Sequence, residues 1–274
     1  MSKKQRIEFK NLNVGNLMTF IDNATAGNFN HTFELSPTEI SCRAFPIDRK
    51  FVKYTGANVK DIFTINSLPE YFESLKIPIY ALDKLKTALS VISDVAVEDA
   101  SGYIDYEADE KNGGLVATSI NFKGKKISNK VKATDQIMFG YMQKSIFDQF
   151  CNTDGYILKF NVERAFKEKV QQLFKLEKES TFTIKYTTDK PGVITFFSGD
   201  EWAYELDGVE VNSQQNFAFD MPKDVINRMR LPLYTVYFTT QSSGKTVMKS
   251  YSDDFNILVN EVVPHDPNRL SVKK

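Results

Sequence analysis

The sequence predicts an α+β protein built from two copies of one domain. Short stretches with period-two alternation and many β-branched or aromatic residues dominate the chain, which indicates antiparallel sheets. Against this background only a few segments have the apolar spacing of a helix. The order of these strands and helices in the first half of the chain recurs in the second half, which predicts a duplication too long in period for a solenoid repeat.

The expected strands alternate between apolar and polar side chains and are bounded by turn residues. They cover 31–35, 40–45, 115–122, 181–187, 192–198, 233–240 and 255–263.

Four amphipathic helices are expected. The longest pattern, 162–178, has one apolar face and a polar face that is rich in basic residues. A second covers 13–26 and is followed by glycine, a common helix stop. A third covers 82–93, and a fourth follows Asp220, a plausible N-cap, and Pro222.

The duplication fixes the expected domain boundaries. We predict a first domain over 1–132, a second over 156–264, and a connector over 133–155 that fits neither pattern. The polar residues 265–274 are expected to be a flexible tail.

Composition limits the function classes. Lys plus Arg and Asp plus Glu are both 35, so the formal net charge is zero and bulk attraction to nucleic acid is not expected. No apolar run is long enough to span a bilayer, and the two cysteines lie far apart in sequence. These features favour a cytoplasmic protein over a secreted or membrane protein.

Signals of catalysis are weak. The segment 239–246 ends like a P-loop but lacks the first glycine and leads into a strand, which favours a hairpin turn. His31 and His265 are the only histidines, too few for a metal site or an activated nucleophile. We therefore predict no enzymatic activity, no cofactor and no metal.

Three stretches carry a resemblance to a known family. They are 79–85 (IYALDKL), 217–222 (FAFDMP) and 255–259 (FNILV), the last followed by Pro264. In this order they resemble the DNA polymerase sliding clamps of the two-domain PCNA and tailed-phage type. The resemblance implies a homotrimeric ring with pseudo-sixfold symmetry, two helices of each domain on its concave face and antiparallel sheets outside. It also implies that the ring encircles duplex DNA without sequence specificity, tethers a polymerase and is placed on DNA by a clamp loader.

A sliding ring should present scattered cations to phosphates and make few base contacts. The candidates are Lys84, Lys86, Arg164, Lys167, Lys175, Lys223 and Arg228. The alternative is that these residues are the solvated faces of surface helices. The helix at 13–26 contains no Lys or Arg, so either the N-terminal cations Lys3, Lys4, Arg6 and Lys10 compensate or this part of the hole is weakly charged.

The basic run 123–132 and the acidic stretch 200–207 occupy the positions at which the family pairs edge strands between subunits. We hypothesise that these two edges pair head to tail, with opposite charges setting the register. The expected interface residues are Lys125, Lys126, Lys130, Glu201, Tyr204 and Glu205. The alternative is that the lysines only protect an exposed edge from aggregation.

The resemblance also implies an apolar pocket for partner peptides. The residues it points to are Phe45, Ile47, Met138, Phe139, Tyr141, Val263 and Pro264. Any one of them could instead belong to the core.

Two rival functions remain open at the sequence level. One is a processivity factor of the herpesvirus kind, which holds DNA without forming a ring and should be strongly basic. The other is a β-rich virion subunit. If the protein comes from a phage, its expected location is the host cytoplasm.

Overall fold

The computed structural model describes residues 5–25, 31–44, 51–79, 81–109, 113–133, 142, 145, 147–148, 155–176, 178–199, 202–240, 244–253 and 256–265. The chain forms two compact units, 1–47 with 53–144, and 48–52 with 145–274.

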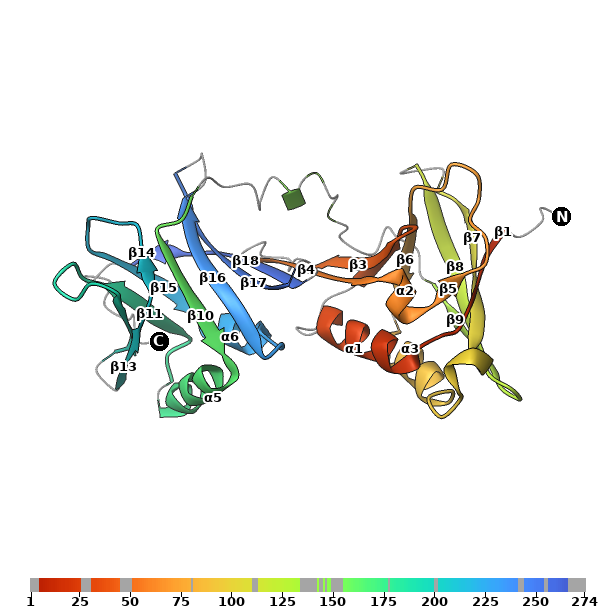
Figure 1. The fold of residues 1–274 in the computed structure, drawn as a ribbon, viewed down its shortest axis with the longest axis horizontal. Helices are drawn as coiled ribbons and strands as arrows, with labels where there is room; N and C mark the ends of the chain where they lie inside the picture. Colours follow the sequence, from red (N-terminus) through yellow and green to blue (C-terminus); the bar gives the residue numbers. More distant parts are fainter. Residues whose placement is uncertain are drawn as a thin grey trace. The chain divides into compact units, whose positions relative to one another are not determined.

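The first unit contains two main helices, a short helix and nine strands among its described residues (Figure 1). The elements are β1 (Gln5–Lys10), α1 (Val14–Thr25), β2 (His31–Leu35), β3 (Glu39–Ala44), β4 (Phe51–Asn58), α2 (Val59–Ile62), β5 (Thr64–Ile65), β6 (Leu75–Ile79), α3 (Leu82–Ser90), the 3-10 turn η1 (Val97–Asp99), β7 (Ser101–Ala108), β8 (Leu115–Lys123) and β9 (Ser128–Lys132).

Alternation along these strands places apolar side chains on the face covered by α1 and α3. In β1, Ile7 and Phe9 are buried while their neighbours are exposed. Helix α1 buries Leu17, Phe20 and Ile21 against the same core. The core of this unit is therefore a layer between its helices and the inner faces of its sheet strands.

The second unit repeats the arrangement. Its elements are β10 (Leu158–Glu163), α5 (Arg164–Leu173), the 3-10 turn η3 (Phe174–Leu176), β11 (Thr181–Tyr186), β12 (Val193–Ser198), β13 (Trp202–Asp207), β14 (Glu210–Val211), β15 (Phe217–Pro222), α6 (Asp224–Arg228), β16 (Leu233–Thr240), β17 (Thr246–Asp253), β18 (Asn256–Glu261) and β19 (Val263–Pro264). Rings of Phe160, Phe166, Phe182 and Phe196 stack or meet edge to face in its core.

The strand pairings of the two units match one for one. In the first unit β5, β1, β7, β8 and β9 pair in that order, and in the second β14, β10, β16, β17 and β18 do the same. The strands β4, β3, β2 and β6 likewise correspond to β13, β12, β11 and β15. One difference is that β8 pairs in parallel with β6, whereas the C-terminal β19 pairs antiparallel with β15. The predicted α+β duplication is confirmed.

The helices differ from the sequence prediction in several places; α3, predicted over 82–93, ends at Ser90. The expected helix 162–178 begins at Arg164 and tightens into η3 after Leu173, because 162 and 163 are still paired in β10. Helix α6 has only five residues, since the buried Met229 and the following strand β16 end it. Helix α2 was not expected, because four residues carry too little periodicity to reveal a helix.

The segment 239–246 is a hairpin, as predicted: β16 and β17 pair antiparallel up to Thr240 and Thr246. Most of the predicted connector 133–155 lies outside the described residues. None of the described helices is long and apolar enough to cross a membrane. The described residues contain no group of three or more His, Cys, Asp or Glu side chains that could hold a metal.

Candidate functional site

Helices α5 and α6 border a groove on the surface of the second unit. The side-chain amide of Gln171 on α5 donates to Oδ1 of Asn227 on α6 at 3.0 Å and joins the two helices. Two adjoining hollows share these amides and Glu168, so they form one continuous groove. Helical spacing explains the arrangement: Val170 is buried, and Glu168 and Gln171 fall on the polar side of α5. Lys175 follows in the 3-10 turn η3.

Cations lie toward both ends of this groove. One hollow is lined by Lys175 and Lys223, and the other by Arg164 and Arg230. Lys223 is half-buried, and its Nζ donates to the backbone oxygen of Phe174 at 3.3 Å. The groove can therefore accept negatively charged groups at two places separated by neutral amides.

The groove also contains one acidic side chain, Glu168, that moderates its charge. Arg164 and Glu168 form an exposed ion pair at 2.8 Å, whose hydrogen bond raises the pKa of Arg164. Arg228 pairs with Asp224 at 3.3 Å on α6. An exposed pair such as Arg164–Glu168 contributes little to stability, so Arg164 can exchange this anionic partner for another at small cost.

Lys167 does not fit the sequence prediction. Its residue is only 7% exposed, and its Nζ donates to the backbone oxygen of Met229 at 3.1 Å and to that of Leu231. Burial lowers the pKa of Lys167, with smaller like-charge effects from Arg164 and Arg230. The ammonium group holds the loop after α6 in place, because it donates to two of its backbone oxygens.

Sequence reasoning missed Arg230, which is exposed and lines the groove. It lies two residues beyond the end of α6, so no helical pattern includes it. The buried Lys167 that holds Met229 and Leu231 also fixes the backbone on either side of Arg230.

The helical face of the first unit is less basic. Lys84 is exposed on α3, while Lys86 pairs with Asp22 of α1 at 2.6 Å. Helix α1 contains no Lys or Arg, and Arg6 does not compensate, because its side chain projects from the opposite face of β1 and binds Asp105. Lys3 and Lys4 lie outside the described residues, so compensation by the N-terminal cations stays a prediction.

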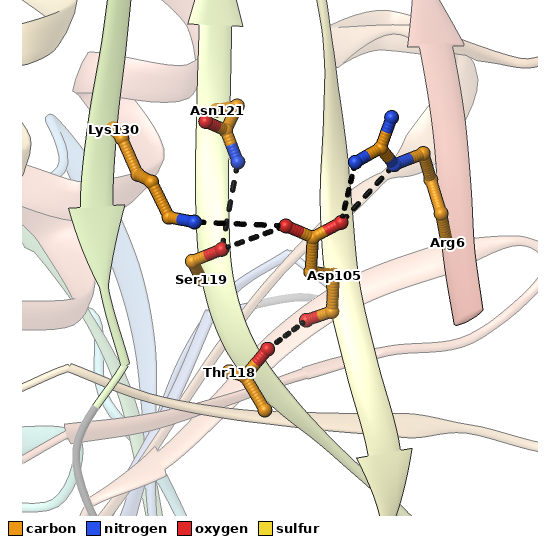
Figure 2. Close-up of polar contacts among 6 residues, drawn as sticks. All are labelled: Arg6, Asp105, Thr118, Ser119, Asn121 and Lys130. Atoms are coloured by element: carbon orange, nitrogen blue, oxygen red, sulfur yellow. Dashed lines mark hydrogen bonds and ion pairs between the residues drawn. The ribbon is translucent and has the colours of Figure 1, made fainter. Parts of the chain in front are cut away.

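Asp105 is the centre of a polar network on that opposite face, which Figure 2 shows. The residue is 2% exposed, and its Oδ1 accepts hydrogen bonds from Nε and Nη2 of Arg6 at 3.0 and 2.9 Å. Ser119 donates to Oδ2 at 3.1 Å, and Nζ of Lys130 lies 3.8 Å from the same oxygen. The carboxylate thus links β1, β7, β8 and β9, the strand at the edge of the sheet.

Strand β9 is the first of the two predicted interface edges. Among the described strands it pairs only with β8. Lys130 lies on the strand, but Lys125 and Lys126 lie in the preceding turn, where Lys125 pairs with Asp99 at 2.8 Å.

Strand β13 is the second predicted edge, and among the described strands it pairs only with β12. The ring of Tyr204 contacts Phe166 of α5, and Glu205 pairs with Lys190 at 2.6 Å. Glu201 lies outside the described residues.

The predicted partner pocket falls largely outside the described part of the chain. This holds for Phe45, Ile47, Met138, Phe139 and Tyr141. Val263 and Pro264 form β19, and both are exposed. His265 is the first residue of the predicted flexible tail, but it contacts strand β15: its Nδ1 lies 2.8 Å from Oδ1 of Asp220.

Comparison with known proteins gives matches by structure and none by sequence. No protein-family model matches the chain, and a search of curated proteins finds no match either. Among solved structures, the proliferating cellular nuclear antigen of Entamoeba histolytica is similar over 95% of this chain and 98% of its own, with 12% identity and a TM-score of 0.61. That of Thermococcus kodakaraensis is similar over 95% and 99%, with 13% identity and a TM-score of 0.54.

A bacterial structure matches as well. The DNA polymerase sliding clamp of Pseudomonas aeruginosa is similar over 97% of this chain but 67% of its own, with 11% identity and a TM-score of 0.60. At these identities the likeness concerns the fold.

Proposed function

We propose that this chain, which has the sliding-clamp fold, is one subunit of a ring that encircles duplex DNA and tethers a polymerase to it. The observation that carries the proposal is the extent of the likeness, since 95% of the chain matches a structure of which it spans 98%. The mechanism is topological and involves no chemical step. A polymerase bound to a closed ring stays at high effective concentration near its template after each dissociation.

The α5–α6 groove supports contact with the DNA backbone. Its cations are few and scattered, and the acidic side chain of Glu168 lines both of its hollows. Phosphate contacts carry no sequence information, so such a surface holds the duplex without fixing the ring at one site. We assign this role to Lys84, Lys86, Arg164, Lys175, Lys223, Arg228 and Arg230, and omit Lys167.

The match to nearly the whole of two solved structures supports a trimer. Sliding clamps close a ring either from three two-domain subunits or from two three-domain subunits. This chain spans nearly the whole of the two nuclear antigens and about two thirds of the bacterial clamp. Either kind of ring contains six domains. A subunit with two such units therefore needs three copies to complete the ring.

The edges β9 and β13 support head-to-tail assembly. Strands β9 and β13 each pair on one side only among the described strands, and the two carry opposite charges. An unpaired edge is a template for another strand, and two complementary edges on one chain generate a ring when the rotation closes.

Partners would bind elsewhere on the ring. We propose that a polymerase and an ATP-driven clamp loader dock near the C-terminal segment, where β19 and His265 are anchored to β15. The pocket residues Phe45, Ile47, Met138, Phe139 and Tyr141 remain predictions.

Retention on circular DNA tests the function. The protein is loaded onto nicked plasmid by the clamp loader that serves the same polymerase. Gel filtration then separates the loaded plasmid from free protein. Half of the loaded plasmid is cut with a restriction enzyme, and the other half stays circular. A ring stays on the circle and slides off the cut DNA, and blocking the ends of the linear molecule restores retention. Equal retention on circular and unblocked linear DNA would show direct, non-topological holding and overturn the proposal.

A further inference from the structure

The sheet of the first unit has an outer face, opposite the face that α1 and α3 cover. On β1, β7 and β8 the apolar side chains such as Ile7 and Ile104 point inward, so the alternate residues point outward. The strand registers join these outward residues in three rows: Lys10–Ser101–Lys123, Glu8–Tyr103–Asn121 and Arg6–Asp105–Ser119. The lysines of β9 belong to the predicted subunit edge and are left out of this surface.

The third row is neutralised within the unit, as Figure 2 shows. Asp105 is 2% exposed and accepts hydrogen bonds from Arg6 at 2.9 and 3.0 Å and from Ser119 at 3.1 Å. The guanidinium carbon of Arg6 lies 3.6 Å from the ring centroid of Tyr103 in the second row. Because Arg6 is held by both a carboxylate and an aromatic ring, it adds little free positive charge to the outer face.

The first row carries two cations that no described carboxylate neutralises. Lys10 and Lys123 are exposed, and neither forms an ion pair with a residue that the structure describes. They lie on either side of Ser101, and neighbouring strands are about 4.8 Å apart, so their Cα atoms are separated by about 10 Å. Two long side chains at this separation can both reach one anion above the short side chain of Ser101.

The second row limits what the first row can bind. Tyr103 is half-buried, and Nζ of Lys123 lies 5.0 Å from its ring centroid. Glu8 lies directly across from Tyr103 and is exposed. A chain of anionic groups that continued from the first row to the second would therefore meet Glu8, so the site favours negative charge confined to one place.

The fold does not require cations in the first row, because the duplicated unit lacks them. Lys10 and Ser101 form the last pair between β1 and β7 before the long helix of the first unit. The matching pair of the second unit, between β10 and β16, is Glu163 with Leu233. An acid and a leucine that is 48% exposed thus occupy the same places in the same architecture. The charge of the first row is a property of this unit and needs another explanation than folding.

We propose that the row Lys10–Ser101–Lys123, together with Tyr103, docks a short acidic segment of a partner protein. A carboxylate of that segment would lie between the two ammonium groups, and an apolar side chain next to it would pack against the exposed part of the Tyr103 ring. Glu8 makes a segment with one or two carboxylates a better fit than the continuous phosphate chain of a nucleic acid. The site goes beyond the proposed ring function, since it lies on the face that α1 and α3 do not cover.

Photo-cross-linking of a synthetic peptide tests the site, because charged surface contacts give specificity more than affinity and covalent capture records weak binding. The probe is a short acetylated and amidated peptide of Gly and Ser with a central Glu-Glu pair followed by benzoylphenylalanine. The matched control probe has Gln-Gln in place of Glu-Glu. After irradiation with the full chain at low ionic strength, peptide mass spectrometry should place the Glu-Glu adducts on β1, β7 or β8 near Tyr103. The Gln-Gln probe should label these strands several-fold less.

Lys10→Ala and Lys123→Ala should each lower this labelling about two- to fivefold, the factor that corresponds to one exposed ion pair. Glu8→Gln should raise it, because a carboxylate next to the site is removed. Lys185→Ala, on β11 of the second unit, should leave it unchanged. All four side chains are exposed, so the variants should fold as the wild type does.

Absence of labelling, labelling independent of Lys10 and Lys123, or labelling in the α5–α6 groove would overturn the proposal. Equal labelling by the two probes would exclude recognition of the carboxylates. Stronger competition by single-stranded DNA than by unlabelled Glu-Glu peptide at equal charge would make the face a nucleic-acid surface and overturn the proposal as well. Retention on circular DNA is measured separately in Lys123→Ala, which should keep it, so failure of the docking site and failure of the ring give different results.

Discussion

The ammonium nitrogen of Lys167 lies 3.1 Å from the backbone oxygen of Met229 and donates a hydrogen bond to it. The contact ties α5 to the loop that carries Arg230. Lys167, which the sequence suggested as a phosphate ligand, therefore supports the loop of Arg230, a candidate ligand that the sequence analysis did not include. Its burial has a measurable consequence, because a charged group removed from water affects stability as a function of pH.

Lys167→Met is expected to remove a pH-dependent part of the folding stability. Burial lowers the pKa of Lys167 in the folded chain below the ordinary value of 10.5. Between the two pKa values the unfolded chain binds more protons than the folded chain, so this residue makes stability rise with pH in the window just below 10.5. Urea unfolding of wild type and variant across that window should give a difference that grows with pH. The exposed Lys185→Met serves as control, and a pH-independent difference would contradict the assignment.

Lys175→Ala and Arg230→Ala should each weaken binding to short linear duplex DNA and reduce its dependence on salt. Removing one phosphate contact lowers the slope of log K against log salt by about 0.9. Fluorescence anisotropy at several salt concentrations measures the slope. Lys185→Ala, an exposed lysine on β11 away from the groove, should leave it unchanged. If the slope is unaltered in both single variants, the groove does not contact DNA.

Gly102→Ala and Gly15→Ala should shift stability in opposite directions. A Cβ at Gly102 would lie 2.1 Å from the backbone oxygen of Asn121 and 2.6 Å from the ring of Phe9, so the sheet must deform. Overpacking of this kind costs about 1–3 kcal/mol or more. Gly15 lies in α1 with 3.5 Å to its nearest neighbour, and alanine there should stabilise by about 0.5–1 kcal/mol. Urea unfolding measures both, and equal effects would show that the close approach at Gly102 is absent.

Cys42 should resist thiol reagents in the folded protein. It is 2% exposed, and burial raises its pKa to about 12, an effect that Lys53 and Arg43 reduce only in part. The reactive thiolate is then almost absent at neutral pH. Alkylation with iodoacetamide followed by peptide mass spectrometry should modify Cys42 only at a rate set by unfolding. Rapid modification under native conditions would show that strand β3 opens locally.

Much of the fold could be predicted from the sequence. Strands such as 233–240 and 31–35 were located because alternation is a local property of the side chains. The duplication followed from the order of those elements. Helix ends and the five-residue α6 were harder, because tertiary pairing and burial end these helices rather than capping residues.

The site was predicted less completely. Lys130, Tyr204 and Glu205 were found on edge strands, because charge and alternation mark an edge. Lys125 and Lys126 were assigned to the same strand, but they lie in the turn 124–127 before it. A short turn cannot be told from strand within a run of lysines. Arg230 could not be predicted, because it lies after the end of α6 and belongs to no helical pattern.

The sequence by itself determined which residues alternate, which segments are amphipathic, and that one domain occurs twice, since these properties depend only on spacing along the chain. The tertiary structure alone decided the fate of each charge. Lys167 is buried against the carbonyl of Met229, and Arg6 is drawn to Asp105, which lies 99 residues away. Whether a cation meets solvent, a carboxylate or a backbone oxygen depends on segments distant in sequence, and only folding brings those together.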